Sequence, residues 1–129
     1  MANRLFVFLI GILCLGILCL SHLAGCITGG SGSTDELFLF SATDGSRGRE
    51  LWRSDGTAAG TFLVKDINSG AGESKPYHFT QVGGTVFFVA DDGSRGVELW
   101  RSDGTAAGTA LVKDIYPGTG SSGILGFER

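Results

Sequence analysis

The sequence predicts an all-β chain made of repeated antiparallel units, and three observations predict it. Residues 44–67 recur at 92–115 with only two differences, Arg49/Val97 and Phe62/Ala110, so one unit has been duplicated at an offset of 48 residues. The segments around this repeat are short, aromatic and β-branched, and Asp-Gly pairs close them. Several of them are apolar on successive residues, which predicts sheets that need cover on both faces.

Composition limits the range of functions. A length of 129 residues is enough for one domain, and 22 glycines indicate many tight turns. The formal net charge is −3 and no basic run is present, which argues against a nucleic-acid partner. The three cysteines all lie within the first 26 residues, so the repeats can form no disulfide of their own.

The N-terminus has the pattern of an export signal. Arg4 precedes an unbroken apolar run, Leu5–Leu20, which is followed by small residues and a cysteine. The ending resembles the lipobox of bacterial lipoproteins, which implies cleavage before Cys26 and lipidation of its thiol. The four residues that carry this resemblance are Leu23, Ala24, Gly25 and Cys26.

We therefore expect a signal peptide at 1–26, a flexible Gly/Ser tether at 27–36 and the repeat region at 37–129. The alternative is an uncleaved anchor helix, because Leu5–Ile27 is long enough to span a bilayer. Both interpretations place the repeats outside the cytoplasm on a membrane. The choice between inner and outer membrane stays open.

The strands are expected in order along the repeats, with units at about 37–76 and 77–122 and a partial third at 123–129. Asp55 and Asp103 are expected to accept backbone N–H bonds in the turn SDGT, and Gly56 and Gly104 to adopt positive φ. Gly83-Gly84 predicts a hairpin turn. The predicted strands are Leu37–Ala42, Arg49–Arg53, Thr61–Ile67, Tyr77–Val82, Thr85–Ala90, Val97–Arg101, Thr109–Ile115 and the lone Gly123–Arg129.

Four strands per unit with both faces apolar is the form of a β-propeller blade, so we expect about two four-stranded blades after the signal helix. A two-sheet sandwich is the alternative, although it needs a more polar outer face. Two blades cannot close a ring, because propellers need about four or more. We therefore expect either a truncated copy or a protomer that associates with other copies into a larger ring.

The repeated motif resembles the ELWxxDGT repeat family of bacterial secreted and surface proteins, over nearly all of residues 37–129. The resemblance implies a propeller-like array with more copies than this chain holds, and it assigns no catalytic residues. The positions that define the motif are Glu50, Leu51, Trp52, Asp55, Gly56 and Thr57, and their counterparts Glu98, Leu99, Trp100, Asp103, Gly104 and Thr105.

The side chains that could carry chemistry each have a structural interpretation that we favour. Turn aspartates could bind calcium, but their spacing fits no known calcium loop, so we expect turn capping and no cofactor or metal. Trp52 and Trp100 could stack on sugars, but repetition favours a core role. For His78 we favour a structural role over membership of a hydrolase triad. We expect Arg47, Arg53, Glu50 and their counterparts to form ion pairs that lock the turns together.

The leading functional hypothesis is a membrane-anchored, extracytoplasmic module that is not an enzyme. It would bind a protein or a polysaccharide through its turn-rich face, with the ligand itself unidentified. One rival is a fragment of a larger propeller protein or of an extracellular hydrolase. Another is an inactive copy produced by recombination between repeats.

Overall fold

A computed structural model describes residues 38–128. The predicted signal peptide, the lipobox with Cys26 and the tether lie outside the described residues. Within residues 38–128 the chain is all-β: seven strands form two antiparallel sheets and no helix is present. This part of the chain accordingly contains no helix that is long and apolar enough to cross a membrane.

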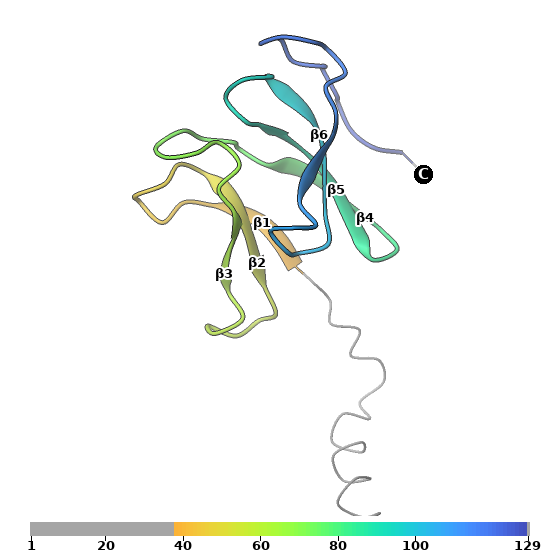
Figure 1. The fold of residues 1–129 in the computed structure, drawn as a ribbon. Helices are drawn as coiled ribbons and strands as arrows, with labels where there is room; N and C mark the ends of the chain where they lie inside the picture. Colours follow the sequence, from red (N-terminus) through yellow and green to blue (C-terminus); the bar gives the residue numbers. More distant parts are fainter. Residues whose placement is uncertain (1–37, 129) are drawn as a thin grey trace, which may run out of the picture. The chain divides into compact units, whose positions relative to one another are not determined.

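The first sheet has three strands in the order of the chain, β1 (Phe38–Ala42), β2 (Glu50–Ser54) and β3 (Phe62–Lys65). Figure 1 shows them in orange to yellow-green at one side of the repeat region. Phe40 lies opposite Trp52 in the β1–β2 register, and the pairing of β2 with β3 shifts between Leu51 and Trp52. This shift marks a β-bulge, which increases the local twist.

The second sheet has four strands, β4 (Tyr77–Val82), β5 (Thr85–Asp91), β6 (Val97–Ser102) and β7 (Ala110–Lys113). Gly83 and Gly84 connect Val82 to its partner Thr85, and Gly83 adopts φ +60°, as a two-residue hairpin requires. Phe88 lies opposite Trp100, and the bulge recurs between Leu99 and Trp100. The duplicated sequence therefore folds with the same register twice.

The expected all-β architecture is confirmed, with seven of the eight expected strands present and no strand end shifted by more than two residues. The exception is Gly123–Arg129, because residues 123–128 form no strand in this chain. Phe127 instead lies against the second sheet, where it lines a pocket with Phe87 and Leu99. Among residues 38–128, the first sheet consequently has three strands, and none of these residues takes the place that β4 has in the second sheet.

The core lies between the two sheets and uses one face of each. Side chains alternate along a strand, so Leu39 reaches this core while its neighbour Phe40 is on the other face. The first sheet and the segment after it contribute Leu39, Leu51, Val64 and Ile67, and the second sheet contributes Val86, Phe88, Ala90 and Trp100.

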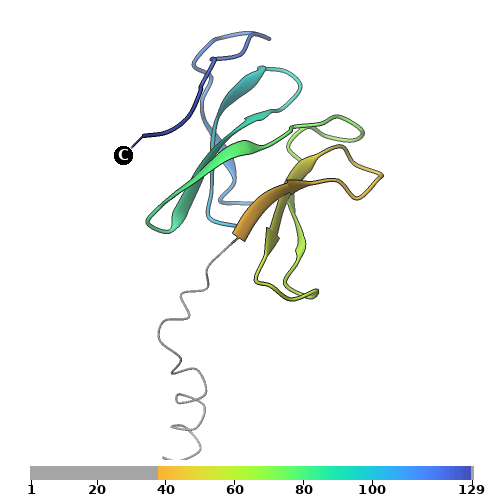
Figure 2. The same ribbon diagram turned by 180° about the vertical axis from the view of Figure 1, so that it is seen from behind.

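Polar contacts also join the two sheets. The Arg53 guanidinium donates to the Gly104 carbonyl at 3.4 Å, and the Lys65 ammonium donates to the Thr109 carbonyl at 2.8 Å. Seen from behind in Figure 2, β1 lies beside β4, and residues of these two strands are in contact. One face of the first sheet is therefore packed against one face of the second.

The opposite faces of the two sheets are only partly covered, although Val89 on the second sheet's outer face is fully buried. Phe38 on the outer side of the first sheet is 65% exposed, and Val112 on the outer side of the second is 45% exposed. The packed counterparts of these two residues, Val86 and Val64, are only 5% and 6% exposed. Equivalent apolar positions are thus buried at the internal contact and exposed at the two outer faces.

Candidate functional site

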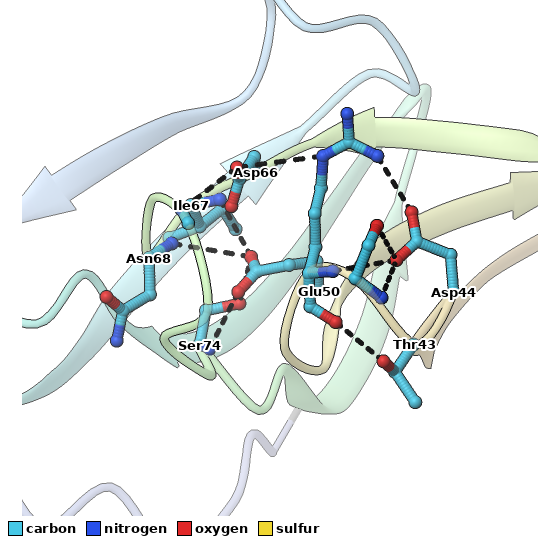
Figure 3. Close-up of polar contacts among 10 residues, drawn as sticks. Thr43, Asp44, Glu50, Asp66, Ile67, Asn68 and Ser74 are labelled. Carbon is cyan, nitrogen blue, oxygen red and sulfur yellow. Dashed lines mark hydrogen bonds and ion pairs between the residues drawn. The ribbon is translucent and has the colours of Figure 1, made fainter.

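The carboxyl group of Glu50 is a polar group of the repeated motif that is fully buried, at the start of β2. Its Oε2 accepts hydrogen bonds from the Ile67 backbone N–H at 2.7 Å and from the Ser74 hydroxyl at 2.6 Å. Its Oε1 accepts from the Ser74 backbone N–H at 2.9 Å. Figure 3 shows these bonds converging on one side chain, which ties β2 to the chain after β3.

The counterpart Glu98 makes a less complete set of contacts. It is fully buried and its Oε2 accepts from the Ile115 backbone N–H at 3.0 Å. Its Oε1 has no hydrogen-bond partner among residues 38–128. The counterpart of Ser74 is Ser122, whose hydroxyl donates to the Val97 carbonyl instead. The hydrogen-bond set of Glu98 therefore lacks the serine contact that Glu50 has.

The turn between β1 and β2 is held together by Asp44. Its Oδ1 accepts from the backbone N–H groups of Ser46 at 2.9 Å and Arg47 at 2.8 Å, and the Arg47 guanidinium donates to its Oδ2 at 2.7 Å. The bonds from the Arg47 and Ser46 backbone lower the pKa of Asp44 well below its usual range. The Nε of Arg47 also lies 3.8 Å from Oδ2 of Asp66.

The same turn recurs in the second unit around Asp92. Partial burial raises the pKa of Asp92, but bonds from Ser94 and Arg95 outweigh that effect, so its pKa is lowered as well. Arg95 forms an ion pair with Asp92, as Arg47 does with Asp44. The predicted ion pairs therefore exist for these two arginines. The expectation is wrong for Glu50, which accepts hydrogen bonds from Ile67 and Ser74, and for Arg53, which donates to the Gly104 carbonyl.

The SDGT turns follow β2 and β6 and have the predicted capping geometry. Asp55 accepts from the Thr57 hydroxyl at 2.7 Å and from its backbone N–H at 2.9 Å, and these two bonds lower the pKa of Asp55. Asp103 makes the same two bonds with Thr105. The expectation that these aspartates accept backbone N–H bonds is confirmed.

The glycines of these turns adopt the expected backbone conformation, Gly56 at φ +90° and Gly104 at φ +84°. A β-branched side chain at this φ is strained by about 1–2 kcal/mol. We predict that Gly56→Val lowers the free energy of unfolding by about that amount. Chemical denaturation measures it, with Gly84→Val as the control. Gly84 has no positive φ and open space around it. Equal effects of the two substitutions would contradict the turn assignment.

The two tryptophans of the motif lie in different environments. Trp100 is 6% exposed and belongs to the core between the sheets, which confirms the predicted core role. Trp52 is half-buried on the open face of the first sheet. The indole N–H of each has no hydrogen-bond partner among the described residues. The exposure of the motif tryptophan thus depends on whether the face of the sheet that carries it is covered.

His78 and the acidic residues do not assemble into a metal centre in the described part of the chain. His78 is exposed at φ +56°, where the β4–β5 register shifts, and its ring contacts Tyr77 at 4.8 Å between centroids. Within residues 38–128 no three His, Cys, Asp or Glu side chains are placed to hold a metal ion. His78 thus lies at an irregularity in the pairing of β4 with β5.

A pocket of about 150 Å³ opens on the outer face of the second sheet. Sequence reasoning missed it, because it forms between strand residues and the C-terminal segment. The one available signal was the match of Phe127 to Phe79 in the preceding unit. The lining of this pocket is mostly apolar. It comprises Thr80, Val82, Phe87, Leu99, Phe127 and Glu128.

Comparison of the chain with protein-family models, with curated proteins and with solved structures gives no match. The function must therefore be inferred from the chain's own residues and surfaces.

Proposed function

We propose that the chain is a membrane-anchored, extracytoplasmic β-repeat module that binds a protein or a polysaccharide and performs no catalysis. The observation that carries the proposal is the pair of exposed turns at Asp44–Arg47 and Asp92–Arg95. Both are fixed in one conformation by the same set of side-chain bonds. A surface that is rigid before binding loses less conformational entropy when a ligand binds. Two identical turns also permit bivalent binding.

We further propose that each sheet is a blade of propeller type. This proposal is supported by the face-to-face packing of the two sheets, in which β1-β2-β3 and β5-β6-β7 have the same order and the same bulge. Blades of a propeller pack in this way and leave turns at their ends. In this arrangement the turns form the binding edge, and the faces serve packing between blades.

The lipobox ending Leu23-Ala24-Gly25-Cys26 leads to a prediction about the membrane anchor. We expect the full chain, expressed in a bacterium, to incorporate a labelled fatty-acid analogue through Cys26. Cys26→Ser should lose the label, with Cys19→Ser as the control that keeps it. Multiple acyl chains hold a protein on a membrane firmly, whereas one chain binds marginally. Equal labelling of the wild type and Cys26→Ser would contradict lipidation at this residue.

Ligand binding is tested with the full chain in detergent against a panel of purified neutral and acidic polysaccharides. Binding should weaken at least tenfold in the double variant Arg47→Ala/Arg95→Ala, which changes both turns. Arg49→Ala is the matched control, because Arg49 is exposed but outside the paired turns. Binding that is unaffected by the double variant would contradict recognition through these turns.

The alternative is that the repeats are a fragment of a larger propeller or of an extracellular hydrolase. The open apolar faces favour the propeller fragment, because further blades of one long chain would cover them equally well. Reading the coding sequence around that of residues 1–129 distinguishes the two. More ELW units indicate a longer array, and a different domain indicates the hydrolase.

A further inference from the structure

We propose that copies of this chain associate head to tail, and that residues 125–128 of one copy complete the three-stranded sheet of the next. The open face of the second sheet in one copy would pack on the open face of the first sheet in its neighbour. This contact would repeat the contact that already exists between the two sheets within one chain. The inference does not rest on the anchor or on binding through the turns.

The apolar residues of the two open faces match those of the internal core, position by position, at the offset of 48. On the second sheet's side, the buried residues Leu39, Leu51, Val64 and Ile67 have the exposed or half-buried counterparts Phe87, Leu99, Val112 and Ile115. On the first sheet's side, the buried residues Val86, Phe88, Ala90 and Trp100 have the counterparts Phe38, Phe40, Ala42 and Trp52.

Exposure shows that these outer positions lack the cover that their counterparts have. Ile115 is 48% exposed where Ile67 is 7% exposed, and Phe38 is 65% exposed where Val86 is 5% exposed. Contiguous apolar surface beyond a few hundred Å² is rare on stable monomers and marks an interaction site. A second copy supplies a surface that already fits, since the same residue types pack together inside each chain.

The polar contacts between the sheets repeat in the same way. Inside the chain, Arg53 and Lys65 donate to backbone carbonyls of the second sheet's turn. Their counterparts Arg101 and Lys113 are exposed, and neither donates a hydrogen bond within residues 38–128. At the offset of 48, their acceptors would be the carbonyls of Gly56 and Thr61 in the next copy. Both lie in the exposed turn after β2.

The missing strand gives a second, independent observation. Within residues 38–128 no strand pairs with the outer edge of β1, whereas the corresponding edge of the second sheet is covered by β4. Residues 125–128 are the counterpart of 77–80, the first residues of β4, yet they pair with no strand within residues 38–128. Leu125 is 91% exposed. Unpaired strand edges are the usual place at which another chain adds a strand.

The register of β4 fixes the geometry of the added strand. Tyr77 lies opposite Val89, so Leu125 of one copy should lie opposite Ser41 of the next. Phe79 stacks on Phe88 at 5.6 Å between ring centroids, so Phe127 should leave the pocket that it lines in its own chain and stack on Phe40 of the next copy. The two contacting surfaces are different, and repeated contacts of this kind close into rings or extend as filaments.

Disulfide cross-linking between copies tests this register. The full chain is used in detergent with Cys14, Cys19 and Cys26 replaced, so that only introduced thiols react. Chains with Leu125→Cys alone are mixed with chains with Ser41→Cys alone and then oxidised. Residues opposite each other on paired strands have Cα atoms about 4.5–5.5 Å apart, within disulfide reach. We expect a cross-linked dimer that joins one Leu125→Cys chain to one Ser41→Cys chain.

Two controls make the result decisive. Tyr77→Cys/Val89→Cys in one chain should cross-link internally, which shows that the second sheet is folded. Ser46→Cys, an exposed residue of the first sheet's turn, should not cross-link to Leu125→Cys. The proposal is overturned if Leu125→Cys and Ser41→Cys fail to link while Tyr77→Cys/Val89→Cys does. It is equally overturned if Ser46→Cys links to Leu125→Cys as well as Ser41→Cys does, since that shows unspecific aggregation. Neither result bears on ligand binding by the turns.

Discussion

Glu50→Ala is expected to lower the free energy of unfolding by roughly 3–5 kcal/mol, because it leaves buried hydrogen-bond donors without an acceptor. Each buried donor left unsatisfied costs about 1–3 kcal/mol. The Ile67 backbone N–H, the Ser74 backbone N–H and the Ser74 hydroxyl all donate to this one carboxyl group. No local side chain replaces it, since the donors lie 17 and 24 residues further along the chain.

Glu98→Ala is the matched control within the same molecule. Glu98 occupies the equivalent position, but it accepts one hydrogen bond, from Ile115, and its Oε1 has no partner in the described part of the chain. Its loss should therefore cost about half as much or less, because fewer donors are orphaned. Urea unfolding followed by tryptophan fluorescence, at one protein concentration, measures both. Equal destabilisation by the two substitutions would show that Glu50 acts through something other than these bonds.

Much of the fold could be predicted from local patterns in the sequence. The duplicated segment, the apolar runs and the Asp-Gly pairs place all seven strands. The positive φ of Gly56 follows from the turn that it occupies. Whether a segment such as Gly123–Arg129 becomes a strand could not be predicted. A strand needs an edge to pair with, and the available edge of the first sheet depends on tertiary structure.

The role of Glu50 could not be predicted from its neighbours. Ion pairing with nearby arginines was the natural expectation, but Arg47 is bound by Asp44 and lies near Asp66. The partners of Glu50 are brought close only when the chain after β3 folds back over β2. A signal was present, because a glutamate that precedes Leu-Trp in an apolar strand is buried in both units. Recognising its partners requires the three-dimensional contact.

Phe88 and Phe40 differ in their cover although they occupy equivalent positions. Both sit at the same point of the repeat, each opposite a tryptophan in the neighbouring strand. Phe88 is fully buried between the sheets, whereas Phe40 is half-buried on the open face. One position thus reports the stability of a single chain, and the other reports the cover that a neighbouring copy would supply.

Phe88→Ala should lower the free energy of unfolding by about 3–5 kcal/mol, the usual cost of removing a buried phenylalanine. Phe40→Ala should cost less than half as much at low protein concentration, because less apolar surface is buried there. At high concentration, however, Phe40→Ala should weaken association at least tenfold, since its ring would take the place of Phe88 at the contact between copies. Urea unfolding and sedimentation velocity across a concentration series measure the two effects. If Phe40→Ala left sedimentation unchanged while the wild-type chain associated, copies would meet through another surface, and the open face of the first sheet would have no part in assembly.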